Sequence, residues 1–142
     1  MEYRKQAHAV YYTPYHIVIS TKYRRKILRG GVGVYLEKSV YQITKRYPDI
    51  EIKEVKTDID HIHILVVIPP KYSVSEIVRI IKANTGKKMR EKFQHLNNVY
   101  WGVKGIWSIG YFVSTVGIDK ETVKNYIRMQ GKEDSGQAKL EF

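Results

Sequence analysis

The order of apolar and polar segments predicts an α+β fold of the ferredoxin-like type, a four-stranded antiparallel sheet with its helices on one face. Four short β-branched or aromatic segments alternate with two segments of helical periodicity in the order β-α-β-β-α-β. One more helical segment follows the last strand. The 142 residues, 43% of them hydrophobic, fit a single domain over residues 1–142.

The first half of the chain predicts a strand, a helix and a hairpin. Residues 15–21 are β-branched and aromatic and lead into a basic loop. After a glycine-rich break at 30–33, apolar residues recur at helical spacing until Pro48, so a helix is expected there. Residues 50–57 and 61–68 are expected to form neighbouring strands joined by the polar turn at 58–60.

The second half predicts a helix, a strand and a final helix. Ser73 followed by Glu76 is a capping box that opens the second helix, with a break expected near Gly86. Residues 106–115 are expected to form the fourth strand. Asp119 is a suitable cap for the last helix, which is expected to end at 130–131, and residues 132–142 are expected to be a flexible tail.

The composition favours a polyanionic partner. Lys and Arg number 25 against 14 Asp and Glu, a net charge of +11, which favours nucleic acid; a basic thermophilic or ribosome-associated protein is the alternative. The absence of cysteine leaves only nitrogen and oxygen ligands for a metal. The sequence contains no signal-like or membrane-spanning apolar run, so a cytoplasmic location is expected.

Two histidines are placed to act together. In a strand over 61–68, side chains alternate, so Ile62 and Ile64 belong to the apolar face and His61 and His63 share the other. Two imidazoles at this spacing can point at one ion. A pair alone is more often hydrogen-bonded or at the surface, so the metal interpretation needs a third ligand.

The last helix offers a phenol and an amide on one face. Tyr126 and Gln130 are four residues apart and therefore lie one above the other. A tyrosine oxygen is a nucleophile only when a metal or base helps to remove its proton. A glutamine carbonyl oxygen can bind a hard divalent ion. Taken singly, such a tyrosine is more often part of the core and such a glutamine is usually solvated.

The blocks taken together resemble the single-tyrosine HUH transposases of bacterial and archaeal insertion sequences, the TnpA-like family, along nearly the whole chain. The similarity lies in Asp60-His-Ile-His-Ile-Leu65 and Tyr126-Ile-Arg-Met-Gln130, together with the stretches at 15–25 and 107–117. It implies a DNA transposase in bacterial or archaeal cytoplasm.

The resemblance implies a mechanism. His61, His63 and Gln130 would hold Mg²⁺ or Mn²⁺ while Tyr126 attacks the scissile phosphate of single-stranded DNA. A 5′-phosphotyrosine and a free 3′-hydroxyl result, and a second 3′-hydroxyl rejoins the DNA without a nucleotide cofactor. Nitrogen and amide oxygen ligands suit Mn²⁺ or Mg²⁺ better than a structural zinc site.

The resemblance also implies a homodimer that binds DNA hairpins at the element ends, with the tyrosine helix of one subunit completing the metal site of the other. Gly117 is the expected hinge of that helix, an ordinary turn glycine being the alternative. Six cations are expected to contact DNA, with a solvated helix face as the alternative for those of the second helix: Arg24, Arg25, Lys82, Lys87, Lys88 and Arg90.

Two other functions compete. A related HUH nuclease, such as a replication initiator or a repeat-associated transposase, would use the same tyrosine on another DNA. A non-catalytic nucleic-acid-binding module would use the twelve tyrosines and two tryptophans as base platforms. That module leaves the pairing of Tyr126 with Gln130 unexplained.

Overall fold

The computed structural model describes residues 3–6, 9–115 and 119–136. Its central feature is a four-stranded antiparallel sheet in the order β4-β5-β3-β6. The strands are β3 (Pro14–Ser20), β4 (Glu51–Thr57), β5 (His61–Val67) and β6 (Phe112–Ser114). This order, with α1 and α3 in the two crossovers, confirms the ferredoxin-like prediction.

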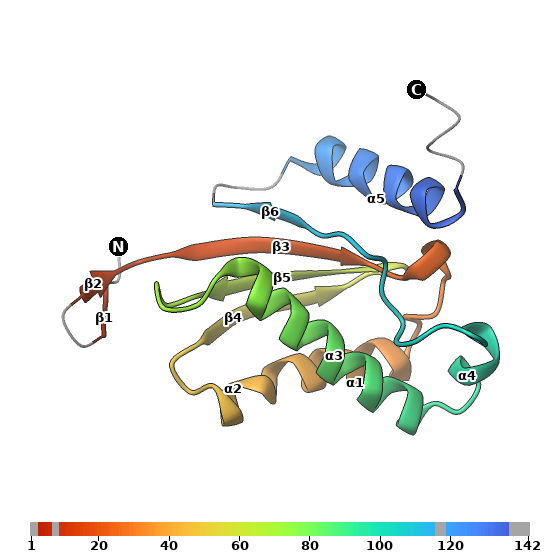
Figure 1. The fold of residues 1–142 in the computed structure, drawn as a ribbon, viewed down its shortest axis with the longest axis horizontal. Helices are drawn as coiled ribbons and strands as arrows, with labels where there is room; N and C mark the ends of the chain where they lie inside the picture. The colour runs from red at the N-terminus through yellow and green to blue at the C-terminus, as the bar shows by residue number, and fades with distance from the viewer. Residues whose placement is uncertain (1–2, 7–8, 116–118, 137–142) are drawn as a thin grey trace.

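The layers of the molecule are visible in Figure 1, where α1 (Gly31–Tyr41) and α3 (Val74–Lys92) cover one face of the sheet and α5 (Lys120–Asp134) lies on the other side. The helix α2 (Ile43–Arg46) continues α1, and α4 (Leu96–Val99) follows α3. A small hairpin of β1 (Arg4–Gln6) and β2 (Ala9–Tyr11) precedes the sheet. No helix within the described ranges combines the length and apolar character that a membrane crossing requires.

The core lies between the sheet and its two covering helices. Ile62 and Ile64 of β5 and Ile17 of β3 are each at most 1% exposed and pack with Leu36 of α1 and Ile81 of α3. These residues occupy alternate positions of the strands and one face of each helix, as the apolar pattern predicted. The histidines of β5 consequently point to the other face, toward α5.

The helix α3 begins as predicted and then continues through Gly86. The Ser73 hydroxyl accepts a hydrogen bond from the Glu76 amide at 3.1 Å, which is half of a capping box. The expected break near Gly86 is wrong, because the helix runs unbroken to Lys92. Gly86 instead permits a close approach: a Cβ there would lie 3.3 Å from the Cα of Gly105.

Two other predicted boundaries are wrong. The strand expected over 106–115 is reduced to β6 and one bridge between Thr21 and Trp107. The last helix does not stop at Gly131 but continues to Asp134, so residues 132–134, expected in a flexible tail, are helical. Residues 137–142 of that tail lie outside the described residues.

Candidate functional site

The two histidines of β5 converge. His63 pairs with Val18 of β3, and His61 pairs with Ser20, so both imidazoles stand on the sheet face opposite the main core. Their Nε2 atoms are 3.1 Å apart. Because metal–imidazole bonds are about 2.0–2.1 Å long, two nitrogens this close are within reach of a single ion.

A buried carboxylate orients His61. The side chain of Asp60, a residue only 8% exposed, has its Oδ1 2.8 Å from Nδ1 of His61. Since the carboxylate accepts, Nδ1 carries a proton, and Nε2 is the ring nitrogen that faces His63. The other oxygen of Asp60 lies 3.6 Å from Nε of Arg24. Asp60 therefore fixes both the ring orientation and the tautomer of His61.

The surroundings of His63 favour its neutral form. Burial lowers the pKa of His63 below the usual value, and the neighbouring His61 lowers it further, while Asp58 opposes them. A neutral imidazole is the form that ligates a metal. His63 is thus suited to ligate a metal, but in the described part of the chain no group of three or more His, Cys, Asp or Glu side chains is placed to hold an ion.

A pocket of about 370 Å³ opens beside the histidines. It is lined by β5, by its preceding turn and by one face of α5, through Arg24, Asp58, Asp60, His61, His63, Lys120, Val123, Lys124 and Ile127. Lys120 and Lys124 place two exposed ammonium groups at this pocket. Reasoning from the sequence missed both lysines, although they recur at positions four apart on the same helix as Tyr126.

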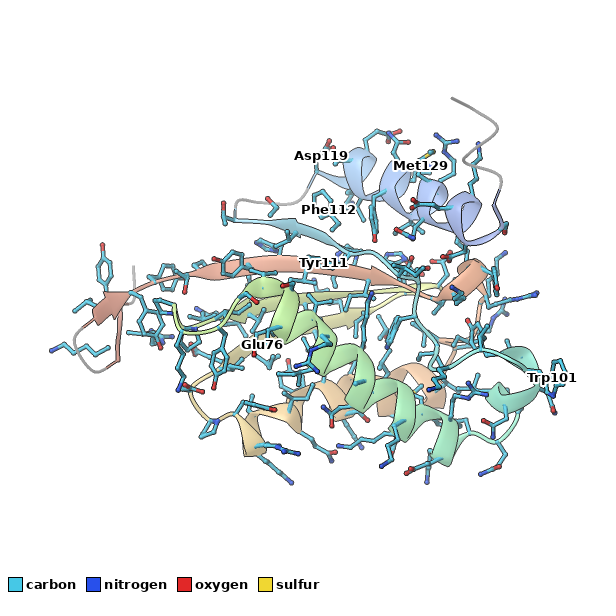
Figure 2. All side chains as sticks on the ribbon, in the orientation of Figure 1. Glu76, Trp101, Tyr111, Phe112, Asp119 and Met129 are labelled. Carbon is cyan, nitrogen blue, oxygen red and sulfur yellow. The ribbon has the colours of Figure 1, made fainter. Side chains whose placement is uncertain are left out.

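Tyr126 and Gln130 lie elsewhere, on the side of α5 that meets β6. A Cβ at Gly110 would be 2.7 Å from Oε1 of Gln130 and 3.4 Å from the Tyr126 hydroxyl. The centroid of the Tyr126 ring lies 6.0 Å from that of Phe112, whose side chain is labelled between β6 and α5 in Figure 2. The structure brings the tyrosine and the glutamine together, as predicted, but neither lines the histidine pocket.

Strand β3 separates the two halves of the predicted site. Val18 is paired with His63 on one side and with Phe112 on the other. Neighbouring strands are about 4.8 Å apart, so the backbones at His63 and Phe112 are separated by roughly 10 Å. With α5 in this position, Tyr126 does not stand beside the histidines of its own chain.

The tyrosine hydroxyl is shielded. It is buried and has no hydrogen-bond partner among the described residues. Burial raises the pKa of Tyr126 above the ordinary value for tyrosine, and the nearby Asp134 and Glu133 raise it further. The phenol is therefore protonated in this arrangement and is held away from solvent.

The C-terminal half of α5 is fastened to the segment after β3. Asp134 accepts hydrogen bonds from the Ser108 hydroxyl and, at 2.9 Å, from the amide of Tyr23 in the short 3-10 helix η1 (Lys22–Arg24). Gly131 faces the methylenes of Arg24, where a Cβ would come within 2.3 Å of Cδ. Val123 and Ile127 are buried and pack against Val18 of β3. Together these contacts form a latch that holds α5 on the sheet.

Several cations expected to contact DNA have structural partners. The Lys82 ammonium donates to the carbonyls of Ser108, Ile109 and Gly110 at 2.7–2.9 Å, and Arg90 donates to Asn97 and Val103. Lys88 donates to the side-chain oxygen of Gln42 at 2.8 Å.

The remaining predicted residues are two cations expected to contact DNA and the expected hinge glycine. Arg25 lies over the ring of Tyr23, and Lys87 is exposed on α3 without a hydrogen bond or ion pair to any described residue. The expected hinge, Gly117, lies outside the described residues.

The sequence matches the family described as transposase, IS200 like, over residues 9–130. The transposase of insertion sequence IS200 from Salmonella typhimurium is 35% identical over 132 residues, covering 90% of this chain and 83% of the relative. The ISDra2 transposase TnpA of Deinococcus radiodurans is 25% identical over 131 residues, covering 92% of each.

Solved structures agree with the sequence matches. A crystal structure assigned as a transposase from Deinococcus radiodurans has a TM-score of 0.77 and 25% identity, covering 89% of this chain and 97% of that one. A REP-associated tyrosine transposase, solved bound to a REP hairpin, has a TM-score of 0.51 and 18% identity over 95% of this chain and 77% of its own. The latter likeness concerns the fold alone.

These matches define the class as transposases, enzymes of DNA recombination that cut DNA and transfer strands. Within that class, the chain belongs to the IS200-like transposase family.

Replacing Gly131 by alanine should loosen α5. The added methyl collides with the Arg24 side chain, so we expect a loss of about 1–3 kcal/mol in the free energy of unfolding or of local opening. Hydrogen exchange of the α5 amides measures this effect. Gly31→Ala is the matched control, because a Cβ there meets no atom within 4 Å. Unchanged protection of α5 in Gly131→Ala would show that this contact does not hold the helix.

Removal of Lys82 should change how stability depends on pH. Burial lowers the pKa of Lys82 from 10.5 to about 8, with Lys22 acting in the same direction and Asp134 opposing. Between pH 8 and 10.5 the unfolded chain binds the proton that the folded chain has released, so stability rises through this window. We therefore expect the stability advantage of the wild type over Lys82→Met to grow between pH 8 and 10.

Denaturant unfolding at several pH values measures that difference. The same substitution at exposed Lys45 shows what the loss of a surface lysine does by itself. If the difference in the free energy of unfolding between wild type and Lys82→Met stays constant or shrinks above pH 8, the pKa of Lys82 is not lowered in the folded protein.

Proposed function

We propose that the chain cleaves and rejoins single-stranded DNA at insertion-sequence ends through a covalent bond to Tyr126, with His61, His63 and Gln130 holding Mg²⁺ or Mn²⁺. The observation that carries this proposal is the convergence of the two Nε2 atoms at 3.1 Å, backed by the carboxylate of Asp60. Membership of the IS200-like family favours insertion-sequence ends over the substrates of initiators.

The donor set fits a hard divalent ion. Two imidazole nitrogens and the amide oxygen of Gln130 leave room for water and phosphate oxygens, which Mg²⁺ and Mn²⁺ accept. The bound ion supplies Lewis-acid polarisation of the scissile phosphate. Gln130 is only 5% exposed and lies beside Gly110, so its participation requires that α5 leave the position described here.

The reaction is a pair of phosphoryl transfers. The Tyr126 oxygen gives up its proton to solvent and forms a bond to the scissile phosphorus, while the bond from phosphorus to the 3′ oxygen breaks and that oxygen takes up a proton from solvent. The products are a 5′-phosphotyrosine and a 3′-hydroxyl. A 3′-hydroxyl of another strand then attacks the same phosphorus and releases Tyr126. The number of phosphodiester bonds is conserved, so no nucleotide cofactor is required.

Neighbouring cations suit the DNA phosphates. Lys120 and Lys124 border the histidine pocket and are exposed, so they can neutralise the strand on either side of the scissile bond. Arg24 belongs to the same pocket, where it also faces Asp60.

Tyr126 reaches the histidines only after α5 moves. The burial of its hydroxyl and the strand between it and His63 support two states, one with α5 latched and one with the site assembled. We propose that assembly occurs in a homodimer, where α5 of one subunit reaches the histidines of the other. We also propose that the substrate DNA carries a hairpin; a solved structure with a similar fold is bound to a REP hairpin.

Tyr126→Phe should abolish covalent attachment to DNA. Incubation of the protein with hairpin-bearing single-stranded DNA from the element ends and Mn²⁺, followed by a denaturing gel, detects the adduct. Wild type and Tyr41→Phe, which alters an exposed tyrosine on α1, should form it. Chelation of the metal should reduce its formation by at least a hundredfold. An adduct that persists in Tyr126→Phe contradicts the proposed nucleophile.

A further inference from the structure

A groove of about 610 Å³ runs along α3, on the side of the sheet away from the histidines. One wall is a single face of α3, and the other is the segment 104–111 that leads to β6. Its lining contains five cations and no carboxylate: Arg79, Lys82, Lys87, Arg90 and Lys104. A groove of one charge attracts an anionic ligand more strongly than scattered surface lysines do.

Two of these cations hold the groove in shape. Lys82 ties α3 to the carbonyls of residues 108–110, and Arg90 reaches the carbonyl of Val103. The Trp107 indole donates to the Thr85 hydroxyl at 2.9 Å, and Gly86 lets the walls approach at Gly105. The walls are thus joined at several points, so a ligand meets a surface that is already formed.

The other three cations are free to bind a ligand. Arg79, Lys87 and Lys104 are exposed, and none of them makes a hydrogen bond or ion pair with another described residue. Arg79 and Lys87 lie two turns apart on α3, and Lys104 belongs to the opposite wall. Their arrangement along both rims matches the repeated negative charge of a nucleic-acid backbone.

The same groove carries apolar surface. Ile109 is 83% exposed at its edge, Tyr111 is half-buried in the wall, and Val78 and Ala83 line the α3 side. Figure 2 shows Tyr111 close to the upper part of α3. Apolar surface between phosphate-binding cations suits the unstacked bases of a single strand. In a duplex the bases are stacked on one another and cannot reach such a surface.

We propose that this groove is a second binding site for single-stranded DNA, separate from the site of strand cleavage. Phosphates bind Arg79, Lys87 and Lys104, and at least one unpaired base packs on Ile109 and Tyr111. The proposal rests on the proposed function in that the substrate is single-stranded DNA. It adds a metal-independent contact on the helical side of the molecule, which holds the strand while the site on the other face is assembled.

The test measures binding without cleavage. Fluorescence anisotropy with a labelled oligothymidine, in the Tyr126→Phe protein with a chelator present, compares two triple variants. One is Arg79→Ala/Lys87→Ala/Lys104→Ala; the other is Lys38→Ala/Lys45→Ala/Arg46→Ala, which removes the same charge from exposed positions of α1 and α2. We expect the groove variant to bind at least tenfold more weakly and its salt slope to fall by about two, since each single-strand phosphate contact contributes about 0.7. The control should stay within threefold.

A third variant separates the base contact from charge. Ile109→Ser should weaken oligothymidine binding severalfold and leave the salt slope unchanged. Equal losses in the two triple variants, or a loss confined to a blunt hairpin without unpaired bases, would overturn the proposal. The proposal would also be overturned if the three groove substitutions disrupted a dimer but left the affinity for oligothymidine unchanged.

The adduct assay keeps this site distinct from the proposed chemistry. At saturating DNA, the groove variant with Tyr126 intact should still form the covalent adduct. If wild type forms no adduct but the groove variant binds oligothymidine more weakly, the groove is still a DNA-binding site and the proposed cleavage mechanism is wrong.

Discussion

The packing of α5 on β3 controls which functional side chains can meet. Val123 and Ile127 cover Val18, which is fully buried at the centre of the sheet. Burial of each such side chain contributes about 1.5–3 kcal/mol, and the contacts of Gly131 and Asp134 add to it. Because these residues share α5 with Tyr126, the packing that stabilises the helix also keeps the tyrosine against Gly110 and Phe112.

This constraint explains why the proposed active site is divided between two parts of the structure. His61 and His63 are oriented on β5, and Tyr126 and Gln130 are paired on α5, yet β3 lies between them. The proposed chemistry therefore depends on exchanging the latched position of α5 for another. In the described position the Tyr126 hydroxyl is buried, so the proposed nucleophile can reach DNA only after that exchange.

The sequence predicted the features that local pattern determines. Alternation along 61–68 placed the histidines opposite Ile62 and Ile64, and the cap at Ser73 marked the start of α3. The sequence did not predict features that depend on contacts between residues far apart in the chain. Gly86 and Gly131 look like helix breakers, but both lie within helices, where the lack of a side chain leaves room for Gly105 and for the Arg24 methylenes. The separation of Tyr126 from His63 depends on the strand between them, which spacing within one helix does not reveal.

The central claim, that latched α5 is unproductive, can be tested by locking it. The chain has no native cysteine, so Val18→Cys/Val123→Cys introduces one possible disulfide between β3 and α5. The measurement is the rate of covalent adduct formation, oxidised and then reduced, with each single cysteine variant as a control. The account predicts loss of the adduct in the oxidised double variant and recovery on reduction. Equal rates in a fully oxidised and a reduced sample would contradict it.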